Sequence, residues 1–131
     1  MREFDLIIIG AGIAGYTAAM RASQLRMSVA VVEKNTTLGG TCLNFGCIPS
    51  KILLNYSEKY HELLHNYSDI GINTGDVKLD LEKMMGKKNQ VVASLCKGIE
   101  GLFSKNKIKP TFIKIRMRIN FLCRSSHITW S

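Results

Sequence analysis

The sequence predicts an α/β fold, the N-terminal part of a doubly wound domain built on a parallel sheet. Three observations predict it. A short apolar run ends in glycine at "DLIIIG", the turn "GAGIAG" and an alanine-rich segment follow, and a second apolar run, "SVAVVE", completes the pattern within about thirty residues. Strand, glycine turn, helix and strand in this order form one βαβ unit, so the second strand should lie parallel to the first.

Each element of this unit has its own justification. The two apolar runs lack a polar alternation, which is typical of strands buried on both faces of a parallel sheet. The segment "YTAAMRASQL" between them is rich in alanine and unbranched residues with good helix propensity. The glycine turn stands where a strand must give way to a helix.

Two longer helices and one further strand are expected downstream. Apolar and aromatic residues recur with a helical period from Ile52 to Leu64, and again across residues 80–104. Gly86, Gly98 and Gly101 weaken the second helix pattern. After Pro110 the period changes to two, which predicts a strand over residues 113–121 with one apolar and one basic face.

Composition indicates a globular chain of one domain. It has 131 residues, 46% of them hydrophobic and 21% charged. No apolar run approaches the roughly 20 residues that span a bilayer, and "MREFDLIIIG" does not resemble a signal peptide. We therefore expect a cytoplasmic protein without a membrane partner, or a mitochondrial matrix protein if a leader precedes this sequence. A reducing compartment favours a catalytic over a structural cysteine pair.

The net charge of +8 is concentrated at the C-terminal end. Residues 1–104 carry eleven Lys or Arg and ten Asp or Glu, whereas residues 105–131 carry seven Lys or Arg and no acidic residue. This basic segment could attract a polyanion. Nucleic acid is a poor candidate, because no aromatic residues of the kind that stack on bases are interleaved with the basic ones.

The glycine turn has the context of a dinucleotide-binding site. Gly10, Gly12 and Gly15 follow a strand and open a helix, and Glu33 ends the next strand. Gly10 would permit the tight turn, Gly12 the approach of a pyrophosphate, and Gly15 close packing of helix on strand. An acidic residue at Glu33 suits a ribose hydroxyl and disfavours a 2′-phosphate, so FAD or NAD is expected. The alternative is a glycine-rich turn without a ligand.

Two of the four cysteines, Cys42 and Cys47, lie five positions apart in "LGGTCLNFGCIPSK". Five residues of regular helix rise about 7.5 Å, beyond the usual ~4.4–6.8 Å between bridged Cα atoms. A disulfide here therefore needs a distorted connection, which Asn44 and Gly46 would tolerate. Two unpaired buried thiols are the alternative. Zinc is disfavoured, because Cys96 and Cys123 stand alone and His61 and His65 lie on a polar stretch. Cys96, on the apolar face of its helix, is expected in the core.

At this point the sequence resembles a known family. "GAGIAG", Glu33, "GGTCLNFGCIPSK" and "KGIEGLF" are similar to the N-terminal part of the dihydrolipoamide dehydrogenase family, which belongs to the FAD-dependent pyridine nucleotide–disulfide oxidoreductases. The resemblance covers about residues 4–109. It implies a partial FAD-binding domain with a redox cysteine pair at residues 1–109 and a divergent basic tail at residues 110–131.

The resemblance implies the following residue roles. The FAD pyrophosphate would be held by the glycine turn and the adenosine ribose by Glu33, with further cofactor contacts from Lys34, Gly40 and Thr41. Cys42 would be the thiol that exchanges with the lipoyl group. Cys47 would lie against the isoalloxazine and form the charge-transfer species, and Lys51 would approach the flavin.

The family resemblance also implies what the whole enzyme does. It oxidises dihydrolipoamide with NAD⁺ through FAD and the redox disulfide, acts on lipoyl groups of 2-oxo acid dehydrogenase complexes, and forms a homodimer. This sequence is much shorter, and we expect it to lack the NAD and interface domains. Ile13 and Ala14 replace the usual proline and glycine, and Arg26 replaces a glycine that commonly ends the first helix. The alternatives are a noncatalytic truncated remnant and a basic binding module carried by residues 105–131.

Overall fold

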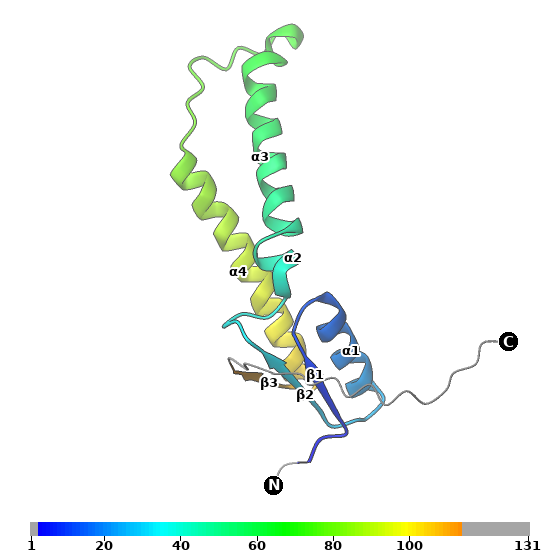
Figure 1. Ribbon diagram of the computed structural model, residues 1–131. Coiled ribbons are helices and arrows are strands. Elements are labelled where there is room, and N and C mark those ends of the chain that lie inside the picture. Colours follow the sequence, from blue (N-terminus) through cyan, green and yellow to red (C-terminus); the bar gives the residue numbers. More distant parts are fainter. Residues whose placement is uncertain (1–2, 114–131) are drawn as a thin grey trace, which may run out of the picture.

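The computed structural model describes residues 3–113, in which a small parallel sheet lies at one end of two long helices (Figure 1). The strands are β1 (Leu6–Ile9), β2 (Val29–Glu33) and β3 (Lys109–Phe112), in the order β1-β2-β3. Both pairings are parallel, with Leu6 opposite Val29 and Ala30 opposite Lys109. This order is one half of a doubly wound sheet. The predicted α/β class and the parallel βαβ unit are confirmed.

Helix α1 (Ile13–Gln24) crosses from β1 to β2. Its C-cap is Leu25, and Arg26 follows with a φ of 66°. That left-handed conformation is favourable for glycine and strained for other residues, because Cβ crowds the following carbonyl oxygen. The glycine that the family resemblance implies at position 26 would therefore have a backbone role, which a comparison of side-chain charge alone does not reveal.

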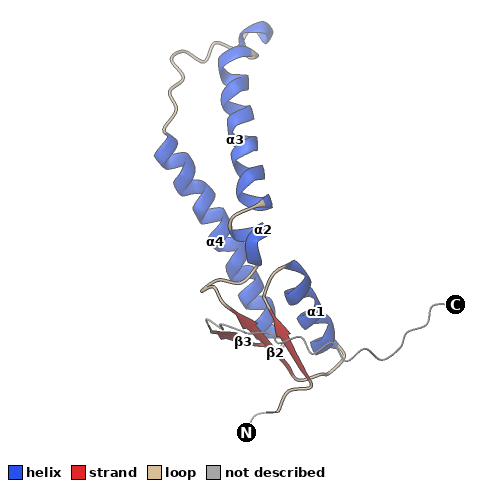
Figure 2. Ribbon diagram, in the orientation of Figure 1, coloured by secondary structure: helices blue, strands red, loops and turns tan. Residues whose placement is uncertain are grey.

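The connection from β2 to β3 is a long helical excursion. It contains α2 (Gly40–Asn44), α3 (Cys47–His65), the short 3-10 helix η1 (Ser68–Ile70) and α4 (Leu81–Lys105). Asp80 caps α4 by accepting a hydrogen bond from the Lys83 N–H at 2.9 Å. Helices α3 and α4 pack side by side and extend away from the sheet (Figures 1 and 2).

Both long helices agree with the sequence periodicity. Helix α4 matches the predicted residues 80–104 closely, and its three glycines have open space around them, so each costs little beyond weaker helix propensity. Helix α3 begins at Cys47, five residues before the first residue of its apolar pattern. No described helix is long and apolar enough to cross a bilayer.

The core lies where α1 and α4 pack against one face of the sheet. Val29 and Val31 of β2 meet Ala19 and Ala22 of α1 on this face, and α4 adds Cys96, Ile99 and Phe103. Phe103 is the largest fully buried side chain. Cys96 is 4% exposed, which confirms the prediction that it is a core residue.

One prediction about β1 is wrong. The run "DLIIIG" was expected to be buried on both faces, yet Ile7 is 59% and Ile9 is 63% exposed. The alternate residues of the same strand, Leu6 and Ile8, pack against the core. The reason is that, within residues 3–113, the helices cover only the opposite face of the sheet (Figure 2). The central strand β2 does match the prediction, with four of its five residues buried.

The strand predicted over residues 113–121 lies outside the described residues except for Ile113, which follows the end of β3 (Lys109–Phe112). Strand β3 begins at Lys109, and Pro110 fits there because it needs no ladder donor at an edge position. All four β3 residues are exposed. The alternating pattern of residues 114–121 lies outside the described residues.

Candidate cofactor groove and redox disulfide

The glycine turn joins β1 to α1 in a tight conformation. Gly10 has a φ of 96°, and its N–H donates to the Val32 carbonyl oxygen at 2.7 Å. Gly12 is the N-cap of α1 and provides no side-chain cap. A Cβ placed on Gly15 would overlap the carbonyl oxygen of Gly10. The helix therefore starts directly at the turn, with its first N–H groups and positive dipole end free to meet an anion.

A groove of about 320 Å³ lies beside this turn. It is bordered by Ile9, Val32, Asn35, Ile113 and six of the eight predicted cofactor residues, namely Gly10, Gly12, Glu33, Lys34, Gly40 and Thr41. The other two lie elsewhere: Gly15 is behind the turn, and Lys51 is exposed on α3. The structure thus brings most of the predicted cofactor residues to one hollow.

The floor of the groove is a close approach of two glycine backbones. Gly40 has a φ of 64°, and a Cβ on it would lie 2.6 Å from the Cα of Gly12. A Cβ on Gly12 would instead meet nothing nearer than the Gly40 Cα at 4.0 Å, so it would enter open space. The Gly39 N–H also donates to the Ala11 carbonyl oxygen at 2.9 Å. These contacts hold the start of α2 against the glycine turn and leave room for a ligand at Gly12.

Glu33 is buried at the edge of the groove, and its carboxylate accepts hydrogen bonds from the protein that the sequence did not predict. One carboxylate oxygen accepts from the Ala11 N–H at 2.7 Å, and the other accepts from the N–H and side-chain amide of Asn35 at 2.9 and 3.1 Å. Burial alone would raise the pKa of Glu33, but these bonds and one from the Lys34 N–H hold its pKa below the ordinary value. The carboxylate is therefore charged and ties β2 to the glycine turn.

Cys42 and Cys47 form a disulfide, with their Cα atoms 4.7 Å apart. The predicted distorted connection is confirmed: α2 ends at Asn44 and α3 begins at Cys47, with Phe45 and Gly46 between them. Cys47 is the first residue of α3, where the helix dipole stabilises a thiolate. Cys42 is half-buried and Cys47 is exposed.

Asn44, between the two cysteines, holds the segment that carries Cys42. Its amide donates to the carbonyl oxygens of Leu38 and Gly40 at 3.0 and 2.9 Å. Its side-chain oxygen accepts from the Thr37 hydroxyl at 3.0 Å and from the Cys96 thiol at 3.4 Å. Burial, together with Glu100, raises the pKa of Cys96, which keeps that thiol protonated as a donor. Asparagine between paired cysteines was predicted only to tolerate a distorted turn.

A second, apolar pocket of about 250 Å³ reaches Cys42. It is lined by Ile13 and Tyr16 of α1, Leu95 and Ile99 of α4, and Gly39, Cys42, Leu43 and Ile48. Cys47 is not among the lining residues. The two sulfur atoms therefore differ in surroundings: one borders an apolar pocket, and the other begins an exposed helix.

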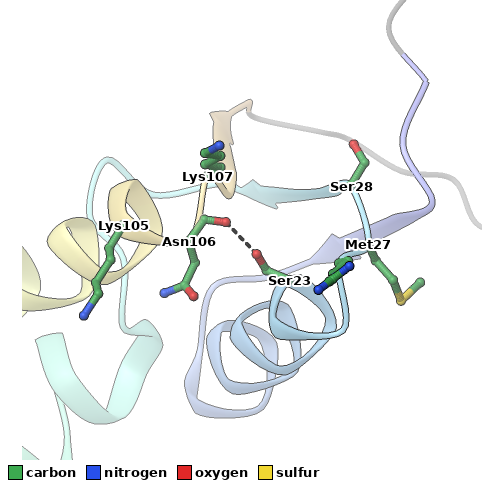
Figure 3. A pocket seen from close by; sticks show the side chains of 7 residues that line it. Ser23, Met27, Ser28, Lys105, Asn106 and Lys107 are labelled. Carbon is green, nitrogen blue, oxygen red and sulfur yellow. Dashed lines mark hydrogen bonds between the residues drawn. The ribbon is translucent and has the colours of Figure 1, made fainter.

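A third hollow, of about 550 Å³, lies at the opposite end of α1 and α4 (Figure 3). Arg26, Lys105 and Lys107 line it, and the Ser23 hydroxyl donates to the Asn106 carbonyl oxygen at 2.5 Å. Because this is where both helices end, the cations neutralise the negative ends of the helix dipoles. That role accounts for their position without a bound anion. Lys105 and Lys107 belong to the basic segment 105–131, most of which lies outside the described residues.

Comparison with known proteins places these features in one family. The sequence pattern described as pyridine nucleotide-disulphide oxidoreductase matches residues 4–119. The chain belongs to this family.

Similar curated proteins carry names of the same kind. A mitochondrial dihydrolipoyl dehydrogenase of Pisum sativum is 50% identical over 86% of this chain and 22% of its own length. A dihydrolipoamide dehydrogenase of Chaetomium thermophilum is 57% identical over 80% and 21%. A leghemoglobin reductase of Vigna unguiculata is 53% identical over 81% and 20%. The chain thus spans about a fifth of the length of these relatives.

Proposed function

We propose that this chain carries the FAD groove and the redox disulfide of a dihydrolipoyl dehydrogenase, a flavoprotein that oxidises dihydrolipoamide with NAD⁺. One observation carries the proposal. Helix α2 is shared by the groove and the disulfide: Gly40 and Thr41 border the groove, and Cys42 is the next residue. A cofactor bound in the groove would therefore lie beside the cysteine pair.

The residues of the groove suit the adenosine diphosphate half of FAD. The N-terminus of α1 offers unpaired N–H groups to a pyrophosphate, and Gly12 leaves space for it. Glu33 borders the groove as a charged carboxylate, the kind of acceptor that suits a ribose hydroxyl. Lys34 borders the groove as a cation, and we keep Lys51 as the residue that would approach the flavin.

FAD would supply a two-electron acceptor close to the disulfide. The cysteine pair would receive those electrons from the substrate. A dihydrolipoamide thiolate attacks the Cys42 sulfur, the Cys42–Cys47 bond breaks, and the electron pair of that bond leaves on Cys47 as a thiolate. The second substrate thiol then attacks the mixed disulfide and releases Cys42. Lipoamide and a reduced cysteine pair result, and two electrons have passed from substrate to protein.

The geometry supports different roles for the two sulfur atoms. Cys42 borders the apolar pocket between α1 and α4, which suits an apolar dithiol such as the lipoyl group. Cys47 begins α3, where the dipole favours a thiolate leaving group. This difference supports the assignment that the family resemblance implies, with Cys42 as the exchanging thiol and Cys47 as the flavin-side thiol.

NAD⁺ as the final acceptor, lipoyl groups of 2-oxo acid dehydrogenase complexes as partners and a homodimer as the working form are further parts of the proposal. They rest on the relatives, of whose length this chain spans about a fifth. A cytoplasmic or mitochondrial matrix location is proposed on the same ground. The names of relatives in Pisum sativum and Arabidopsis thaliana include the word mitochondrial.

Trapping a lipoyl adduct tests the roles of the two cysteines. In Cys47→Ser, Cys42 is free to attack oxidised lipoamide, and no resolving thiol is present to release the adduct. Alkylation of the second lipoyl thiol then fixes it. Peptide mass spectrometry should find the adduct on Cys42, whereas Cys42→Ser should give at least about tenfold less adduct on Cys47.

Cys96→Ser combined with Cys47→Ser is the matched control and should not alter the yield, because Cys96 is buried outside the pocket and a serine hydroxyl can still donate to Asn44. Equal adducts on Cys42 and Cys47 would refute the assignment. No adduct on either thiol would favour the noncatalytic alternative.

A further inference from the structure

Two histidines form a pair on α3, far along the helix from the disulfide. His61 and His65 lie four residues apart and are both exposed. Their ring centres are 4.5 Å apart, with the ring planes inclined at 46°. Residues four apart share one face of a helix, so both imidazoles project from the last turns of α3 in the same direction.

The spacing of the rings matches a bidentate metal chelate. A metal–nitrogen bond is about 2.1 Å, and the centre of an imidazole ring lies roughly 1.1 Å behind its ligating nitrogen. If the two nitrogen–metal bonds meet at a right angle, the ring centres lie about 4.5 Å apart. At the tetrahedral angle, the ring centres lie about 5.2 Å apart. The observed distance of 4.5 Å between the two ring centres agrees with the value for right-angled binding. Neighbouring ligands at right angles are typical of square-planar and octahedral ions such as Cu²⁺ and Ni²⁺.

The surroundings exclude a more elaborate site in the described part of the chain. The segment His61-Glu62-Leu63-Leu64-His65 has the letters of the HExxH motif, in which a zinc ion takes a third protein ligand and Glu acts as a base. Among residues 3–113, however, no group of three or more His, Cys, Asp or Glu side chains could hold a metal ion. Neither histidine lines the apolar pocket at Cys42 or a second hollow beside α3, which Leu53, Tyr60 and Met84 line. The arrangement therefore suits binding, with water as the remaining ligands, and not hydrolysis.

We propose that His61 and His65 form a two-histidine chelate for a divalent transition-metal ion with right-angled coordination, of which Ni²⁺ and Cu²⁺ are the representative cases. The site is independent of the groove and the disulfide. Ni²⁺ is the better probe, because Cu²⁺ also reacts with thiols and this chain has four cysteines.

Calorimetric titration of the purified chain with Ni²⁺ tests the proposal. The chain should bind one ion, and His61→Ala or His65→Ala should each lower the affinity by at least about tenfold. The chain has three histidines, and His127→Ala is the matched control, expected to change nothing. The combination of His65→Ala with Asn66→His keeps two histidines but moves one to another face, so it should not restore binding.

Thermal unfolding provides a second measurement that does not depend on heat of binding. Ni²⁺ should raise the melting temperature of the wild-type chain and leave that of His61→Ala unchanged, because a ligand that binds only the folded state stabilises it. The proposal is overturned if the wild-type chain takes up no Ni²⁺, if His127→Ala abolishes uptake, or if the pair moved to different faces binds as tightly as the native one.

Discussion

Glu33 shows how one side chain can serve both the fold and a cofactor. Its carboxylate accepts three hydrogen bonds from Ala11 and Asn35, and its pKa is lowered in spite of burial. An acid at the end of the second strand was predicted from the sequence as a ribose ligand. The bond to Ala11 could not be predicted, because it depends on how closely the glycine turn approaches β2 in the folded sheet.

Glu33→Gln should lower the free energy of unfolding at pH 7 by about 1–3 kcal/mol. The reason is that a neutral amide replaces the charged carboxylate as the acceptor of the hydrogen bonds from Ala11 and Asn35. The folded-state pKa lies below the ordinary value of 4.5, so the charge-dependent stability is fully present above that pH and is lost as the pH falls below it. The difference between wild type and variant, measured by urea unfolding from pH 7 to pH 3, should therefore shrink with acidification. A difference that is constant over this range would contradict the account.

Substitutions of Gly15 and Gly12 should distinguish effects on stability from effects on cofactor binding. Gly15→Ala should destabilise the chain by about 1–3 kcal/mol, because its Cβ would overlap the Gly10 carbonyl oxygen. Gly12→Ala should leave the free energy of unfolding within about 0.5 kcal/mol, since its Cβ meets open space. It should instead weaken FAD binding by about tenfold or more, because that space is the groove. Urea unfolding and an FAD titration of both variants check the pair, and equal effects on both properties would refute it.

At the scale of elements, the break between α2 and α3 is what makes the disulfide possible. A continuous helix would hold the two Cα atoms too far apart, whereas Phe45 and Gly46 bring them to 4.7 Å. The sequence indicated that such a break was required. It could not indicate what holds α2 in place, because the bonds of Asn44 run to Leu38 and to Cys96, and Cys96 lies 52 residues away.

Asn44→Ala should lower the free energy of unfolding by about 2–3 kcal/mol, because four hydrogen bonds are lost and their partners are left partly buried. It should also slow closure of the disulfide after reduction, since Cys42 is no longer held near Cys47. Asn55→Ala on the exposed face of α3 is the matched control and should be neutral or slightly stabilising. Unfolding and reoxidation of the two variants can be compared directly, and similar behaviour would show that Asn44 has no positioning role.

At the scale of the whole molecule, the sheet is covered on one face only within residues 3–113. The sequence predicted the parallel strands and their connection correctly, because periodicity and the glycine turn are local signals. It failed for Ile7 and Ile9, because burial on the second face depends on what else packs there. Parallel sheets of this kind are normally covered on both faces. The boundary between the FAD-binding domain and the basic tail, placed between residues 109 and 110, stays a prediction. So does the role of that tail.

The central claim is that the hollow at the glycine turn holds the adenosine diphosphate half of FAD beside the disulfide. Titration of the purified chain with FAD, followed by quenching of flavin fluorescence, tests it most directly. We predict saturable binding of one FAD per chain with a dissociation constant of roughly micromolar or tighter, displacement by ADP, and little binding of FMN, which lacks the adenosine half. Absence of saturable FAD binding, or equal binding of FMN, would contradict the account.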